Sequence, residues 1–87
     1  MVKDLRVEVR AITDETGAVG ELRYYVRIFN MAYGIKIELC TSEGIVFSEE
    51  TCELTYSYDD AEGWVKKLAS GRVTPMSLHD MADEFVG

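Results

Sequence analysis

The sequence has little of the residues that cross-link small domains or break regular structure: among 87 residues there are two cysteines, one histidine and one proline. With one proline and 47% hydrophobic residues, the composition is that of a folded domain and not of a disordered chain. No apolar run reaches the roughly 18 residues typical of a transmembrane helix. Lys3, Asp4 and Arg6 interrupt the region where a signal peptide would lie. A chain of this length supports one core, so we expect a single domain over residues 1–87.

Two cysteines are too few for the disulfide framework of a small secreted protein. If a tight turn over residues 41–44 pairs the strands on either side, Cys40 lies opposite Val46 and far from Cys52. We therefore expect two free thiols and a cytoplasmic location, where thiols stay reduced.

Basic residues are also scarce: nine face 16 acidic residues, and the formal net charge is −7. Such a chain lacks the basic footprint that non-specific binding to nucleic acid requires, and anionic membranes repel it too. Between Glu38 and Val65 there are eight acidic residues and no basic one. This segment is interpreted either as a solvated acidic edge that aids solubility or as a docking surface for a basic partner.

Motifs for catalysis are missing from the sequence. His79 is the only imidazole that could activate a cysteine or serine, and neither a nucleophile elbow nor a glycine-rich phosphate loop is present. His79 and Asp83 lie one helical turn apart, but zinc needs a third and usually a fourth ligand. The adjacent Glu49 and Glu50 are expected to face water, where a carboxylate has no use in acid catalysis. We predict no catalytic residue, no metal site and no cofactor, and favour a non-catalytic protein over an enzyme.

Alternation of apolar and polar residues predicts an antiparallel sheet in the first two thirds of the chain. Four strands are expected, over residues 4–12, 21–29, 34–41 and 44–57. In the first strand the residues expected to face the core are Leu5, Val7, Val9 and Ala11. Because residues 48–50 are polar, the fourth strand either resumes after a bulge or gives way to a fifth strand.

Charge favours one of two registers for the first hairpin. Pairing Arg6 with Arg27 would place like charges opposite each other. The other register pairs Glu8 with Arg27 and Arg10 with Tyr25, and this register is expected.

Two helices are expected over residues 59–70 and 75–86, where the apolar residues take the helical period. Either Asp59 with Glu62 or Ser57 with Asp60 caps the first helix, and Gly71 is its candidate C′ residue. Thr74-Pro75 begins the second helix, whose apolar face comprises Leu78, Met81, Ala82, Phe85 and Val86. This order predicts an α+β fold: an antiparallel meander of four to five strands followed by two C-terminal helices packed on one sheet face.

The outward face of the expected sheet combines cationic and aromatic side chains, both of which are common at interfaces. This candidate interaction face consists of Arg6, Arg10, Arg23, Tyr25, Arg27, Phe29 and Lys36. Three interpretations stay open: a solvated face with cross-strand ion pairs, a surface for a partner or a second copy, and a platform for single-stranded RNA. The net negative charge counts against the third.

Two short patterns stand out: Tyr33-Gly34-Ile35 after the first hairpin, and the C-terminal residues Val73, Pro75, Leu78, Asp80 and Phe85. In these the chain resembles a family of short bacterial proteins known only as a domain of unknown function. The resemblance spans most of the chain and implies a stand-alone domain, with no catalytic residue, cofactor or partner attached. Gly34 is expected to permit a backbone geometry that a β-carbon forbids.

Together these features favour a non-catalytic protein-interaction or regulatory module that acts through an exposed sheet face or edge, with a homodimer as one form of the interaction. The expected partner is therefore a protein or a second copy, and not nucleic acid or a membrane. The alternative is a small-molecule-binding protein or minor enzyme. Its pocket would lie between helices and sheet, near Cys52, Tyr56, Tyr58 and Trp64.

Overall fold

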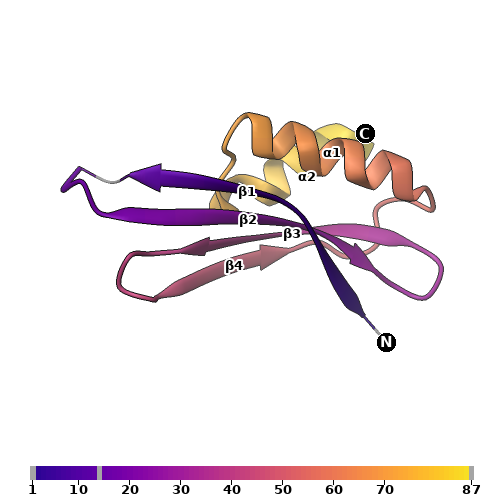
Figure 1. Ribbon diagram of the computed structural model, residues 1–87. Coiled ribbons are helices and arrows are strands. Elements are labelled where there is room, and N and C mark those ends of the chain that lie inside the picture. Colours follow the sequence, from indigo (N-terminus) through magenta and orange to yellow (C-terminus); the bar gives the residue numbers. More distant parts are fainter. Residues whose placement is uncertain (1, 14, 87) are drawn as a thin grey trace.

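A computed structural model describes residues 2–13 and 15–86, apart from the side chain of Val86. The strands within this range are β1 (Lys3–Thr13), β2 (Val19–Ile28), β3 (Tyr33–Cys40) and β4 (Val46–Glu50). They form one antiparallel sheet in the order β1-β2-β3-β4. The helices are α1 (Tyr58–Ser70) and α2 (Leu78–Val86), with the 3₁₀ turn η1 (Pro75–Ser77) before α2. Figure 1 shows both helices on one side of the sheet, so the predicted α+β meander is confirmed.

Apolar and polar residues alternate along β2 and β3, and the apolar ones form the part of the core that the sheet contributes, as predicted. Fully buried side chains project from these two central strands toward the helices, and α1 and α2 complete the cluster. The core residues are Leu22, Tyr24, Val26, Ile35, Ile37, Ala61, Val65, Leu68, Ala69 and Leu78. Burying each large aliphatic side chain stabilises the fold by about 1.5–3 kcal/mol, so this cluster holds both helices on the sheet.

The faces of β1 differ from the prediction because the strand contains a bulge. The register with β2 shifts between Arg6 and Glu8, so that one extra residue, Val7, lies in β1. One extra residue moves the side chain of each following residue in the strand to the other face of the sheet. Beyond the bulge, Val9 lies opposite Arg23 on the uncovered face, whereas Arg10 lies opposite Leu22 on the helix-covered face. The prediction that Val9 and Ala11 face the core is therefore wrong.

The predicted hairpin register is wrong as well. Arg27 lies opposite Asp4, and Tyr25 lies opposite Arg6. This register still places an acid beside Arg27, but it does so with Asp4 in place of Glu8. The connection between β1 and β2 contains Asp14, which lies outside the described residues.

The fourth strand ends at Glu50, and the described residues contain no fifth strand. Thr51 turns inward instead: it is buried, its Oγ1 accepts a hydrogen bond from the Ile35 amide (3.0 Å), and its hydroxyl donates to the Cys52 carbonyl (2.8 Å). Thr55 then makes an isolated bridge with Tyr33. The chain thus continues along β3 as an irregular segment that leads to α1.

Gly34 lies beneath this irregular segment. A β-carbon there would lie 2.5 Å from the Cys52 carbonyl oxygen and 2.8 Å from Thr51 Oγ1. The φ angle of Gly34 is not positive, since the positive-φ glycines are Gly17 and Gly44. The glycine is therefore required by close approach of another backbone segment and not by an unusual conformation of its own.

Both ends of α1 are defined by local hydrogen bonds. Ser57 is the N-cap, and its side chain accepts from the Asp60 amide at 3.2 Å, which selects one of the two predicted caps. At the other end Gly71 has φ −88°, and the left-handed residue is Arg72 with φ 50°. Gly71 is thus the C-cap residue, and Arg72 takes the C′ position that was predicted for the glycine.

Candidate functional site

The uncovered face of the sheet, called the open face below, brings together six of the seven predicted interaction residues. Arg6, Tyr25 and Lys36 lie side by side across β1, β2 and β3. The guanidinium of Arg27 lies over the Phe29 ring at 5.7 Å, and that ring approaches Gly34 from the same face. Arg10 is not part of this group because the bulge places it on the opposite face.

Ion pairs connect all four strands across the open face. From β1, Asp4 accepts hydrogen bonds from Arg27 (3.0 Å) and from Lys36 (3.3 Å). Arg27 also lies 2.9 Å from Glu50 of β4, and Lys36 lies 3.7 Å from Glu38. The side chains of Arg27, Lys36 and Glu38 are at most 20% exposed, so these charges largely cover one another.

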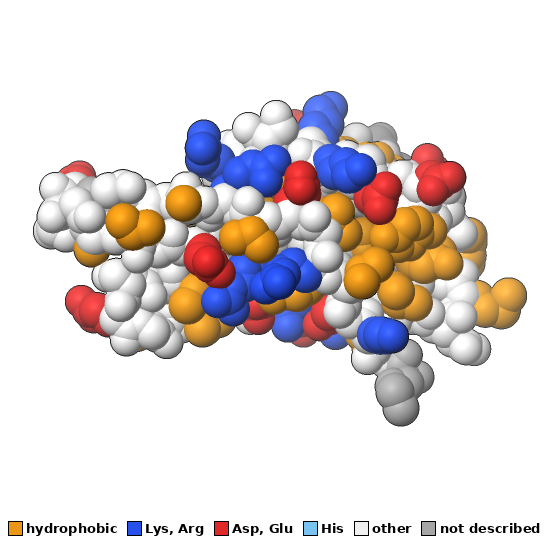
Figure 2. Space-filling model, in the orientation of Figure 1, with side chains coloured by type: hydrophobic (Ala, Val, Ile, Leu, Met, Phe, Trp, Pro, Cys, Tyr) orange, Lys and Arg blue, Asp and Glu red, His pale blue; other side chains and the backbone are white. Residues whose placement is uncertain are grey.

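Charges of the two signs balance on this face. Burial and the hydrogen bond that its hydroxyl donates to Glu38 raise the pKa of Tyr25, which keeps the phenol neutral within the network. Four basic and four acidic side chains share the face: Arg6, Arg23, Arg27, Lys36, Asp4, Glu21, Glu38 and Glu50. In Figure 2 acidic and basic groups also lie next to one another over the strands. Arg23, Arg27 and Lys36 each lie within ion-pair distance of an acidic side chain. A surface of zero formal charge whose cations mostly have acidic partners offers little attraction to a phosphate backbone.

Replacing Asp4 with asparagine is expected to lower the free energy of unfolding by about 0.5–1 kcal/mol at low salt, because one carboxylate serves two cations. High ionic strength should reduce this loss through screening. Urea denaturation at two salt concentrations measures both effects. Glu43→Gln, an exposed acid in the turn before β4, is the control and should change stability little. A loss of equal size at both salt concentrations would contradict an electrostatic role.

His79 pairs with a residue that spacing along the helix did not suggest. Its Nε2 lies 3.0 Å from Glu49 Oε2, so α2 is joined to β4 rather than to its own Asp83. Both side chains are exposed. Within residues 2–13 and 15–86 no group of three or more metal-ligating side chains is close enough to hold an ion.

The outer edge of β4 is the most open part of the sheet. All five residues of β4 are exposed, and Val46 and Phe47 have relative exposures of 51% and 55%. The Thr41 amide donates a hydrogen bond to the Ile45 carbonyl, and the Thr51 amide donates one to the Ile35 carbonyl. Since hydrogen-bonded and non-hydrogen-bonded pairs alternate along an antiparallel ladder, these two bonds show which residues of β4 bond to β3. In this alternation the amides and carbonyls of Val46, Ser48 and Glu50 point away from β3, toward the free edge.

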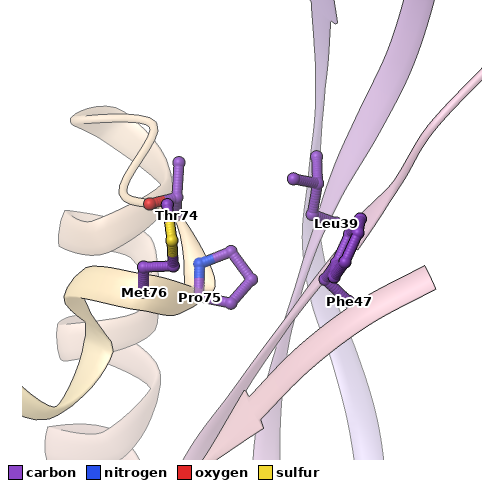
Figure 3. A pocket seen from close by; sticks show the side chains of 5 residues that line it. All are labelled: Leu39, Phe47, Thr74, Pro75 and Met76. Carbon is purple, nitrogen blue, oxygen red and sulfur yellow. The ribbon is translucent and has the colours of Figure 1, made fainter. Parts of the chain in front are cut away.

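An apolar hollow of about 220 Å³ adjoins this edge on the helix-covered side. Figure 3 shows Pro75 of η1 pointing across it toward Leu39 and Phe47, with Met76 and Thr74 beside Pro75. Met76 is 89% exposed, so a large flexible side chain borders the hollow without being covered by the protein's own core. Sequence reasoning missed this site, which joins residues from β3, β4 and η1.

Two of the residues predicted near the alternative small-molecule pocket take part in separate aromatic pairs. Tyr58 packs edge-on against Tyr33 and donates a hydrogen bond to Glu62, and Trp64 stacks on Phe85. Tyr56 is 85% exposed. These side chains are engaged in separate pairs or face solvent.

Fold and site together define a small α+β domain with a free strand edge at β4 and an apolar hollow beside it. The sequence profile of a family of unknown function, DUF6514, matches residues 4–87, and the chain belongs to this family. No curated protein and no solved structure matches the chain. Among the described residues, no helix has the length and apolar character that crossing a membrane requires.

Proposed function

We propose that this protein is a non-catalytic protein-interaction module that binds its partner through the β4 edge and the adjoining hollow, not through the centre of the open face. The supporting observation is the coincidence of an unpaired strand edge with exposed apolar side chains, Val46, Phe47 and Met76. Exposed apolar groups beside unpaired backbone are a liability for a lone domain and are common where a partner binds. The two free cysteines support a reducing, cytoplasmic setting for this interaction.

The other edge strand, β1, is less suited to binding a partner strand than β4 is. β1 carries charged residues along its length and a bulge at Val7, both of which discourage pairing with another strand. β4 is short but has no bulge or proline within it. The open face is less suitable because its paired charges would have to be desolvated on binding.

A metabolite-binding role fits the hollow less well. Pockets for small molecules usually enclose about 300–1,000 Å³ and contain several converging polar groups. The hollow is smaller, and Thr74 is the only polar residue among the five that line it. Its size and apolar lining suit one inserted side chain of a protein partner.

Photo-crosslinking tests this proposal. A photoreactive residue at Val46 should capture a specific protein in the native host, whereas the same group at Arg6 of the open face should not. The captured protein is then purified, and its dissociation constant is measured. Phe47→Ser should weaken binding by at least about tenfold, and Tyr25→Ala should change it by less than about twofold. Loss of binding with Tyr25→Ala but not with Phe47→Ser would move the interface to the open face and overturn the proposal.

A further inference from the structure

We infer that the partner segment is an extended basic peptide that adds to the sheet as a fifth strand, antiparallel to β4. This inference rests on the proposed function and specifies what the β4 edge recognises. Addition of a strand satisfies the outward amides and carbonyls of Val46, Ser48 and Glu50 with backbone hydrogen bonds. The antiparallel direction continues the arrangement of the other four strands.

The alternation of β4 defines which side chain the peptide places at each position. Val46, Ser48 and Glu50 lie on the open face, and Phe47 and Glu49 lie on the helix-covered face. A peptide residue opposite Phe47 therefore lies beside the hollow, where an apolar side chain is favoured. Residues opposite Glu49 and Glu50 lie one on each face, next to a carboxylate.

Charge supports a basic peptide. β4 ends in Glu49 and Glu50, which lie 3.0 Å from His79 and 2.9 Å from Arg27 but keep about half of each side chain exposed. Glu43 and Glu53 lie before and after the strand, and the sequence has no basic residue between Glu38 and Val65. An incoming lysine or arginine would lie opposite each glutamate of the strand, which stabilises cross-strand pairs. Written from its N-terminus, the preferred order is basic, basic, polar, apolar, apolar.

The same charges disfavour a second copy of this chain as the occupant. Antiparallel pairing of β4 with β4 about Ser48 would place Glu49 opposite Phe47 and Glu50 opposite Val46, so neither glutamate would gain a basic cross-strand partner. Opposite charges on paired strands stabilise a sheet, and a basic peptide supplies them whereas a second β4 does not. The expected protein is therefore a monomer in the absence of its peptide.

The first experiment titrates the full chain with the blocked peptide Lys-Arg-Thr-Leu-Val-Thr and follows backbone amide shifts by NMR. Shifts are expected at residues 45–51, at Thr74 and at Met76, with a dissociation constant of roughly 0.1–1 mM that rises with salt. The analogue Glu-Glu-Thr-Leu-Val-Thr should bind at least about tenfold more weakly. Glu49→Lys should reduce this preference for the basic peptide.

A matched pair of N-methylated peptides tests strand addition without altering the protein. Methylation of the central threonine, opposite Ser48, removes a hydrogen bond to β4 and should abolish binding. Methylation of leucine, opposite Phe47, affects an amide that points to solvent and should change binding by less than about threefold. Equal effects of the two methyl groups, or shifts confined to other residues, would overturn strand addition.

The outcome also separates this inference from the proposed function. If a captured native partner depends on Phe47 but the basic peptide does not bind, the interaction module stands and the extended peptide is wrong. If sedimentation instead reveals a dimer that Ser48→Pro dissociates, the occupant of the edge is a second copy, and the peptide inference is likewise overturned.

Discussion

Gly34→Ala is expected to lower the free energy of unfolding by about 2–3 kcal/mol and the melting temperature by roughly 10–20 °C. The added β-carbon would lie 2.5 Å from the Cys52 carbonyl oxygen and 3.1 Å from Phe29 Cε2. Relief of the first contact requires the segment around Thr51 to move away from β3. That movement breaks the hydrogen bond from the Ile35 amide to Thr51 Oγ1 and leaves a buried amide unpaired.

Gly63→Ala is the matched control for this substitution. Gly63 lies within α1, and no atom lies within 4 Å of the position that its β-carbon would take. Alanine should therefore stabilise the protein by about 0.5–1 kcal/mol through helix propensity alone. Thermal and urea denaturation of both variants measure the contrast. A Gly34→Ala variant within about 0.5 kcal/mol of the wild type would show that the segment above Gly34 adjusts freely.

Gly34 illustrates how far sequence reasoning reaches in this fold. The pattern Tyr33-Gly34-Ile35 predicted that glycine is required, and the structure supports the requirement while changing its reason. A glycine needed for its own φ angle follows a turn pattern that is local in sequence. A glycine needed because Cys52 passes over it depends on residues that are 18 positions away, and no local pattern records that contact.

The strands show the same division between local and distant causes. β2 and β3 are central strands with uninterrupted alternation, so their faces could be predicted correctly residue by residue. β1 alternates just as regularly, yet the bulge at Val7 exchanges its faces beyond that point. Since no glycine marks the bulge, the sequence gives no signal that Arg10 joins the helix-covered side.

The candidate binding site could be predicted only in part. The sequence shows eight acidic residues and no basic one between Glu38 and Val65, and one interpretation of this segment is a docking surface for a basic partner. The hollow could not be predicted, because it forms only where η1 approaches β3 and β4. Pro75 predicts the start of a helix, but its position across from Phe47 is set by the packing of α1 on the sheet.

Alkaline pH is expected to destabilise the protein through Tyr24. This side chain is fully buried, and its hydroxyl donates a hydrogen bond to the Val73 carbonyl at 2.8 Å. Burial raises the pKa of Tyr24 from 10.0 to about 12. Because the folded pKa is the higher one, the associated stability is fully present below pH 10 and is lost as the pH rises through about 12. The loss at the upper end is roughly 2–3 kcal/mol.

Tyr24→Phe separates this titration from ordinary packing. At neutral pH the variant should be less stable by about 1 kcal/mol, because the Val73 carbonyl loses its donor. Above pH 10 its stability should fall less steeply than that of the wild type, so the two curves converge. Tyr56→Phe alters an exposed ring and should follow the wild-type curve. Urea denaturation across this pH range measures all three proteins, and parallel curves for wild type and Tyr24→Phe would rule out Tyr24 as the titrating group.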